Sequence, residues 1–195
     1  MVEQVSLAHI PPELAVYVAL YTELENAAFL RDQLLAGNTD FEYAFIDASM
    51  VVSRNQVLAA TFRALNDYLH DRLKSRNVHS EIVFSLSPNN NIGEAFRRFG
   101  ISADTKDLIV VKVTTTPDVN LETIQAHLST AVKAQEVQLV DDSLAECSDL
   151  ARIRRVYKLP VPASNKPANG VQPSRSDRNQ LEAQILGVMA LRGAT

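Results

Sequence analysis

The alternation of apolar and polar positions along the chain predicts four β-strands. Large apolar residues share one side of residues 16–21, which is typical of a strand with one larger buried face. Two nearly unbroken apolar runs, at 82–86 and 108–113, are typical of strands that helices cover on both faces. A shorter apolar pattern at 137–140 predicts the fourth strand.

Capping residues and apolar stripes predict six helices. Ser, Thr, Asn and Asp stand at their expected first positions, where these side chains accept hydrogen bonds from free backbone amides. The expected helices cover residues 23–36, 54–74, 92–99, 121–132, 150–156 and 176–193. In the longest helix the expected buried stripe consists of Leu58, Phe62, Leu65, Leu69 and Leu73. Segment 43–52 is ambiguous by periodicity, and we interpret it as a further short helix.

An asparagine-rich turn, SPNNN at 87–91, follows the second apolar run. Its proline ends the expected strand, because the ring offers no amide hydrogen to a neighbouring strand. Asn91 and Glu94 have the spacing of a capping box, so a helix is expected to begin at Ile92. Gly100 is expected to end this helix in the left-handed conformation.

The same turn is a candidate binding site. The side chains of Asn89, Asn90 and Asn91 and several free amides converge at a helix start, where the helix dipole favours anions. Such a site suits a phosphate or the polar edge of a base, and Arg97 and Arg98 follow in the last turn of the helix. The alternative is purely structural, since asparagine is a preferred residue for turns and caps.

The segment from 160 to 175 differs sharply from the rest of the chain. Four of the eight prolines lie there among Ser, Asn and Gly, which is typical of a linker. The helix expected at 176–193 has an apolar stripe formed by Leu181, Ile185, Val188 and Met189. This stripe must be buried, either on the chain's own domain or on a partner.

Composition limits the possible functions. With 195 residues and 46% apolar side chains, we expect one core in residues 1–159, and the net charge of −4 does not attract the whole molecule to nucleic acid. The lone Cys147 excludes an internal disulfide, and the four histidines lack metal-ligand spacing. No glycine-rich phosphate loop is present and no apolar run reaches the ~20 residues that cross a bilayer. We therefore expect no catalysis, cofactor, metal or membrane contact.

The densest basic cluster lies near residue 155 and comprises Arg152, Arg154, Arg155 and Lys158. Tyr157 lies among them and could stack on a base. We favour the simpler interpretation, in which these cations interact with the carboxyl end of a helix.

Several segments resemble the family of kinase-binding subunits of the KEOPS (EKC) complex, which includes PRPK-binding protein. The sharpest similarity is LSPNNNIGEAFRRFGI at 86–101 followed by DLIVVKV at 107–113. Two weaker similarities, FIDASMVVS at 45–53 and IRRVYKL at 153–159, occur in the same order as in the family. The resemblance spans about residues 15–159.

This resemblance implies a non-catalytic subunit that binds and regulates the complex's small atypical kinase and, through it, meets the other subunits. It further implies recruitment of tRNA by its single-stranded CCA end, for synthesis of threonylcarbamoyladenosine. We expect a protein that is monomeric alone, in nucleus and cytoplasm. The expected tRNA-binding residues are Asn89, Asn90, Asn91, Ile92, Arg97 and Arg98. The expected kinase interface is formed by Leu181, Ile185, Val188 and Met189.

The expected fold is a single α/β (α+β) domain. Its sheet should be mixed but mainly antiparallel, with about four strands and helices on both faces. Two other functions remain open: a scaffold without RNA contact, and a small enzyme acting on a phosphorylated metabolite at the asparagine turn.

Overall fold

One antiparallel sheet forms the centre of the protein. The computed structural model describes residues 1–114, 119–160 and 174–192, and all structural statements below refer to these residues. The strands are β1 (Glu3–Val5), β2 (Ala15–Thr22), β3 (Ala44–Asp47), β4 (Leu108–Thr114) and β5 (Gln135–Val137). β4 pairs with β2 along its whole length and with β3 on its other side. β1 and β5 pair with successive parts of β2, so β2 and β4 are central.

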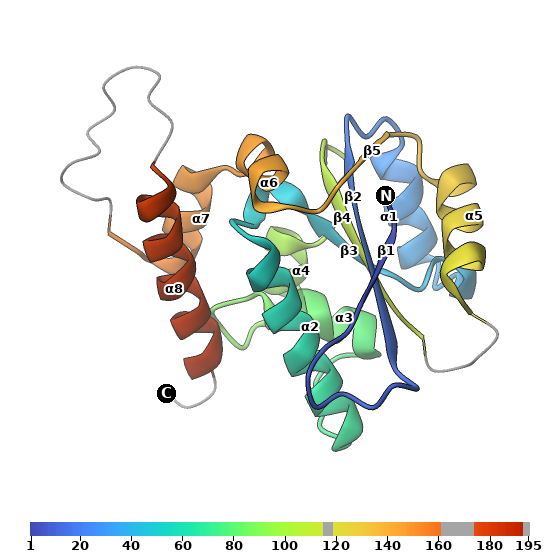
Figure 1. Ribbon diagram of the computed structural model, residues 1–195, viewed down its shortest axis with the longest axis horizontal. Helices are drawn as coiled ribbons and strands as arrows, with labels where there is room; N and C mark the ends of the chain where they lie inside the picture. The colour runs from blue at the N-terminus through green and yellow to red at the C-terminus, as the bar shows by residue number, and fades with distance from the viewer. Residues whose placement is uncertain (115–118, 161–173, 193–195) are drawn as a thin grey trace.

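Helices cover both faces of this sheet, as the sequence predicts (Figure 1). The α-helices are α1 (Ala27–Leu35), α2 (Arg54–Leu69), α3 (Val78–Ser85), α4 (Ile92–Phe99), α5 (Leu121–Ala131), α6 (Asp141–Cys147), α7 (Leu150–Tyr157) and α8 (Arg175–Leu191). Two short 3₁₀ helices are η1 (Thr39–Phe41) and η2 (Ala48–Met50). Alternate residues of β2 enter two cores, one with α1 and α5 and the other with α2, α3 and α8. The result is a single α/β domain with an antiparallel sheet.

The apolar run at 82–86 lies in helix α3, so the prediction of a strand there is wrong. The helix begins where the Asn77 side chain accepts a hydrogen bond from the amide of Ser80 at 2.8 Å. α2, α4, β3 and β4 all pack against it, and therefore nearly every residue of α3 is buried. A helix that is buried on all sides has a continuous apolar sequence, which periodicity cannot distinguish from a buried strand.

Two further predictions are corrected nearby. Segment 43–52 is not a helix but strand β3 followed by η2, and the Asp47 side chain caps η2 through the amide of Ser49 at 3.0 Å. In α2 the predicted stripe is offset: Leu65 is buried, whereas Phe62 and Leu69 are 37% and 40% exposed. Small residues such as Ala60 and Ala64 face the core instead, where they allow close packing of the helix.

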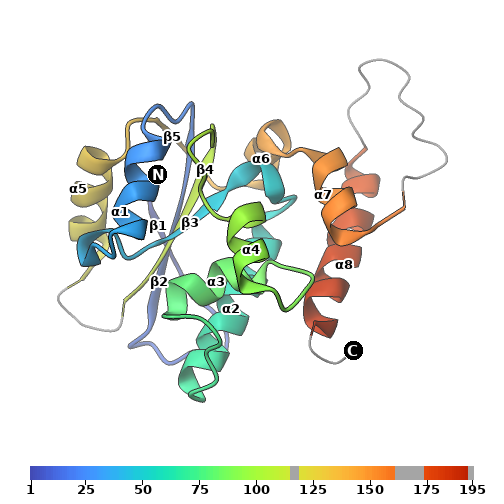
Figure 2. The same cartoon turned by 180° about the vertical axis from the view of Figure 1, so that it is seen from behind.

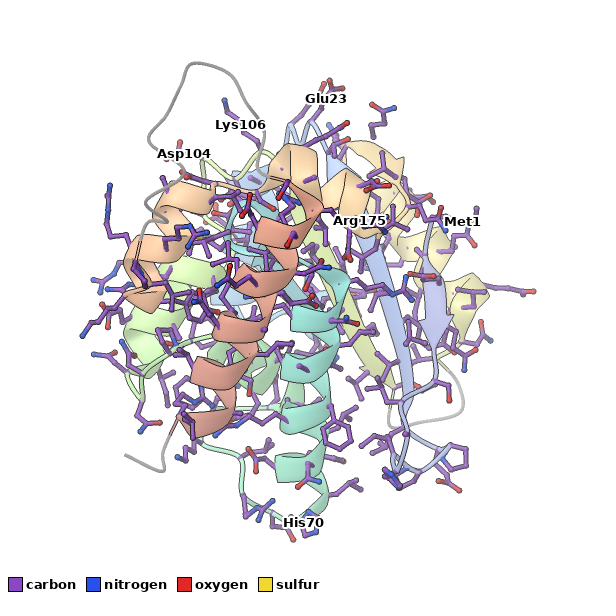
Figure 3. All side chains as sticks on the ribbon, turned by 60° about the vertical axis from the view of Figure 1, so that its left-hand side comes forward. Met1, Glu23, His70, Asp104, Lys106 and Arg175 are labelled. Carbon is purple, nitrogen blue, oxygen red and sulfur yellow. The ribbon has the colours of Figure 1, made fainter. Side chains whose placement is uncertain are left out.

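Helix α8 packs on the chain's own domain, alongside α2 (Figure 3). Leu181, Ile185 and Met189 are 1%, 0% and 4% exposed and belong to the same core as β2 and α2. In the docked helix these three side chains lie in the chain's own core, and the kinase interface expected from them stays a prediction. Val188 is only partly buried. Of the expected linker, residues 161–173 lie outside the described residues, and Ser174 already caps α8.

Arginines fix the carboxyl end of α8. Arg63 of α2 donates hydrogen bonds to the carbonyl oxygens of Met189 and Arg192 in the last turn of α8, where carbonyl groups lack the regular helical donors. The buried Arg192 guanidinium lies 4.0 Å above the Phe84 ring and donates to the carbonyl oxygens of Phe84 and Ser87. The end of α8 is thus joined to the segment that leaves α3.

A buried histidine connects α3 to the centre of the sheet. The Nε2 atom of His79 accepts a hydrogen bond from the amide of Val113 at 3.0 Å. Burial, with a smaller effect of the nearby Lys112 ammonium, lowers the pKa of His79 from 6.5 to about 3. The imidazole is therefore neutral in the folded protein.

This histidine should make the fold sensitive to acid. Between pH 6.5 and 3 the unfolded chain binds a proton that the folded chain does not, so the free energy of unfolding falls as the pH falls. His79 alone should contribute up to about 1.4 kcal/mol per pH unit in this window. Urea unfolding at pH 7, 6 and 5 measures the slope. His79→Gln keeps an acceptor for Val113 but does not titrate, so an unchanged slope in that variant would contradict the assignment.

Candidate functional site

The asparagine turn is held by its own side chains. The Oδ1 atom of Asn89 accepts hydrogen bonds from the amide of Asn91 at 3.0 Å and from the hydroxyl of Ser87 at 3.3 Å. The Nδ2 atom of Asn89 donates to the carboxylate of Glu94 at 2.7 Å. Asn89 therefore uses its polar atoms within the turn, as the structural interpretation of these asparagines requires.

Helix α4 begins as the capping signal predicts, with one difference. The Oδ1 atom of Asn91 accepts a hydrogen bond from the amide of Glu94 at 2.9 Å, and the helix starts at Ile92. The Glu94 carboxylate does not return to Asn91 but contacts Asn89 and forms an ion pair with Arg98. Three of the expected tRNA-binding side chains are thus engaged inside the protein.

The helix ends differently from the prediction. Gly100 has φ −76° and ψ 164°, which is extended backbone and not the left-handed conformation. Glycine is required here because a Cβ atom would lie 2.7 Å from the carbonyl oxygen of Phe96. This close approach lets the chain continue along the edge of the sheet, where Gly100 bridges to Ile46 and the amide of Ile101 donates to the carbonyl of Phe45 at 3.1 Å.

The remaining expected residues form two separate groups. Asn90 is exposed beside the first amides of α4, at Ile92 and Gly93, which have no acceptor within the helix. Arg97 is exposed in the last turn of α4, about 7.5 Å along the helix axis from Ile92. The structure therefore brings Asn89, Asn91 and Arg98 together, leaves Asn90 free on the turn, and places Arg97 apart from it.

The basic cluster of α7 also contains both an arginine paired inside the protein and exposed residues. Arg152 contacts the Asp47 carboxylate at 3.2 Å, whereas Arg155 and Lys158 are exposed. Tyr157 is 3% exposed, so it cannot stack on a base as the sequence suggested. Its hydroxyl accepts from the Nε2 atom of Gln56 at 3.0 Å and donates to the carbonyl of Leu86. Burial raises the pKa of Tyr157 above its usual value.

A pocket that the sequence did not predict lies beside α4. It has a volume of about 530 Å³, and its lining includes Arg31, Arg76, Arg97, His79, Phe96 and Ile101. These residues come from three separate stretches of the sequence, and no local motif connects them. The one local signal of the pocket is Gly100, because a glycine at this position reflects close packing of the chain against the edge strand β3.

Residues 1–114, 119–160 and 174–192 contain no group of three His, Cys, Asp or Glu side chains that could hold a metal ion. Burial raises the pKa of Cys147 to about 11, so its thiol is protonated at neutral pH and is a poor nucleophile. In this part of the chain every helix is too short or too polar to cross a bilayer.

Two adjacent asparagines should behave differently when they are replaced. Asn91→Ala removes the cap of α4 and should lower the free energy of unfolding by about 1 kcal/mol. Asn90→Ala, which removes an exposed side chain, should change it by less than about 0.5 kcal/mol. Urea unfolding at constant pH measures both. Equal losses in the two variants would show that the cap does not carry the turn's structural role.

Known proteins resemble this chain over nearly its whole length. The family model described as kinase binding protein CGI-121 matches residues 21–193. The EKC/KEOPS complex subunit cgi121 of Aspergillus terreus is 55% identical over 193 residues, covering 99% of this chain and 97% of the relative. The subunit of the same name in Schizosaccharomyces pombe is 32% identical over 184 residues, covering 93% and 95%. The chain therefore belongs to the CGI-121 family of kinase binding proteins.

Proposed function

We propose that this chain is a non-catalytic subunit of a KEOPS-type complex, in which it binds and regulates the small atypical kinase and helps to recruit tRNA for synthesis of threonylcarbamoyladenosine. One observation carries the proposal. The family match covers residues 21–193, and relatives that align over almost their full length are named as subunits of the EKC/KEOPS complex. The expected location in nucleus and cytoplasm belongs to the same proposal.

The kinase contact in this proposal uses the outer edge of α8. Val188 is partly buried and Leu191 is 61% exposed, and residues three apart lie on the same side of a helix. Leu181, Ile185 and Met189 hold the helix on the domain from the opposite side. Three residues of the expected stripe thus hold α8 on the domain, while Val188, its fourth residue, forms the kinase contact together with Leu191.

The RNA contact in this proposal is small and centred on Asn90. Its exposed amide group and the free backbone amides of Ile92 and Gly93 can bind the edge of an unpaired base or a phosphate. Arg155 and Lys158 of the nearby helix α7 add exposed positive charge, and the buried contact of Tyr157 with Leu86 places that helix beside the turn. With a net charge of −4, the chain has to rely on such a local site.

A scaffold without RNA contact is the rival function. Asn89, Asn91 and Arg98 make internal hydrogen bonds or ion pairs, which fits a turn with a structural purpose alone. Binding of purified chain to isolated tRNA distinguishes the two functions.

Leu191→Glu should weaken binding of the kinase at least tenfold. A charge placed in the centre of an apolar contact costs about 2 kcal/mol or more, while Leu191 is too exposed for the change to unfold the domain. Ala126→Glu adds the same charge to α5, on the opposite face of the sheet, and should leave the affinity unchanged. Isothermal titration with the purified kinase measures both. Equal affinities for the two variants would remove this edge of α8 from the interface.

Asn90→Ala should weaken binding of full-length tRNA about two- to tenfold, the loss expected from one net hydrogen bond. The loss should be smaller for tRNA that lacks its CCA end, because the turn is proposed to bind that single strand. Filter binding at fixed salt compares the two RNAs, and Arg72→Ala on the far loop controls for general charge. If the variant binds both RNAs as the unchanged chain does, the scaffold function is the better description.

A further inference from the structure

The lining of the 530 Å³ pocket comes from α1, η1, β3, α3 and α4. Figure 2 shows the edge strand β3 with α1 on one side and α3 and α4 on the other. The pocket lining includes Asn77, His79 and Ser80, which form the start of α3. The amino end of this eight-residue helix carries the positive end of its dipole. The pocket therefore offers a favourable position for an anion before any side-chain charge is counted.

The buried His79 supplies a second, independent indication of a ligand. Its Nε2 atom accepts the Val113 amide, so the proton of the neutral imidazole must lie on Nδ1. The Nδ1 atom is buried and has no hydrogen-bond partner among the described residues, although the side chain is 5% exposed and lines the pocket. The low pKa of His79 keeps this donor neutral at physiological pH. A buried donor without an acceptor is unfavourable, and an oxygen atom of a ligand would satisfy it.

Three guanidinium groups surround the mouth of the pocket. Arg31, Arg76 and Arg97 are exposed, and in the described residues Arg76 and Arg97 form no ion pair. Glu42 also lines the pocket, but its carboxylate accepts a hydrogen bond from the Asn77 side chain at 2.6 Å. The lining alone thus has three positive groups and one negative group, although Asp32 beside the pocket forms an ion pair with Arg31 at 3.8 Å. This excess of positive charge favours an anionic ligand.

The walls of the pocket are apolar. Val83, Phe45 and Ile101 are buried there, while Leu35 and Phe96 are 70% and 36% exposed at its rim. Exposed large apolar side chains around a concave site favour a ligand with an apolar body. Their aromatic and branched surfaces suit a flat ring.

We propose that this pocket binds a small phosphate monoester that carries a planar ring. The phosphate lies between the arginines and the start of α3, with one oxygen near the Nδ1 hydrogen of His79, and the ring contacts Phe96 and Ile101. A phosphate monoester is close to a dianion at neutral pH, and arginine binds its oxygens through paired N–H groups. This inference does not rest on the proposed role of the chain as a subunit.

Phenyl phosphate is the probe that tests the proposal. In ¹H–¹⁵N NMR spectra of the full chain, it should shift the amides of Asn38, Ser80 and Ile101 in a saturable way. Phenol and inorganic phosphate, which each carry half of the probe, should bind at least fivefold more weakly. Phenylacetate, a monoanion with the same ring, should also bind more weakly. Equal affinity for all four molecules, or no saturable shift with phenyl phosphate, would overturn the proposal.

Substitutions of lining residues distinguish binding in the pocket from binding elsewhere on the surface. Arg76→Ala should weaken phenyl phosphate at least fivefold, whereas Arg72→Ala, four residues away and paired with Asp67, should not. His79→Gln should weaken it as well, and Arg76→Ala remains informative if the buried substitution unfolds the domain. Equal binding by the Arg76→Ala and Arg72→Ala variants would contradict the site.

Two controls distinguish failure of this ligand proposal from failure of the proposed function. Arg76→Ala should bind the kinase normally, so loss of the phosphate ligand and loss of the partner are measured independently. A short RNA that displaced phenyl phosphate at lower concentration than free nucleotides would reassign the pocket to RNA and overturn the small-molecule ligand.

Discussion

The carbonyl groups at the end of α3 are the point on which the other elements converge. Arg192 donates to the carbonyls of Phe84 and Ser87, and Tyr157 donates to that of Leu86. A helix end that is buried among other helices leaves carbonyl oxygens that must find donors inside the protein. Here α7 and α8 supply these donors, so two segments from the last quarter of the chain complete a helix from its middle. The asparagine turn follows directly after these carbonyl groups in the sequence.

Local signals in the sequence predicted most helix starts correctly. The caps Ser53, Asn91, Asn120 and Asp149 each accept a hydrogen bond from an amide of their helix, because capping depends on a few adjacent residues. Both central strands were also predicted, β2 from the alternation of its large apolar residues and β4 from its unbroken apolar run. The fold class and the starts of these helices therefore follow from short-range chemistry.

The errors arise where tertiary packing decides. α3 is apolar on all sides because four elements surround it, so its sequence has no helical periodicity. In α2 the close approach to α3 favours alanines over the leucine stripe, which no local rule reveals. The pocket could not be predicted because Arg31, Arg76 and Arg97 meet only after folding, and neither could the burial of Tyr157. The asparagine motif was recognised, but not that two of its three side chains hold the turn itself.

The arrangement also links the two surfaces of the proposed function. Arg192 follows directly after Leu191 at the end of α8, and its guanidinium reaches the Ser87 carbonyl. Ser87 in turn exchanges hydrogen bonds with Asn89, whose side chain positions the amide of Asn91. A partner that moved the end of α8 would therefore change the support of the turn through Arg192, without any contact of its own with the turn. A partner that bound the outer edge of α8 and left Arg192 in place would stabilise both this edge and the asparagine turn. The reason is that the hydrogen bonds of Arg192 hold both of them.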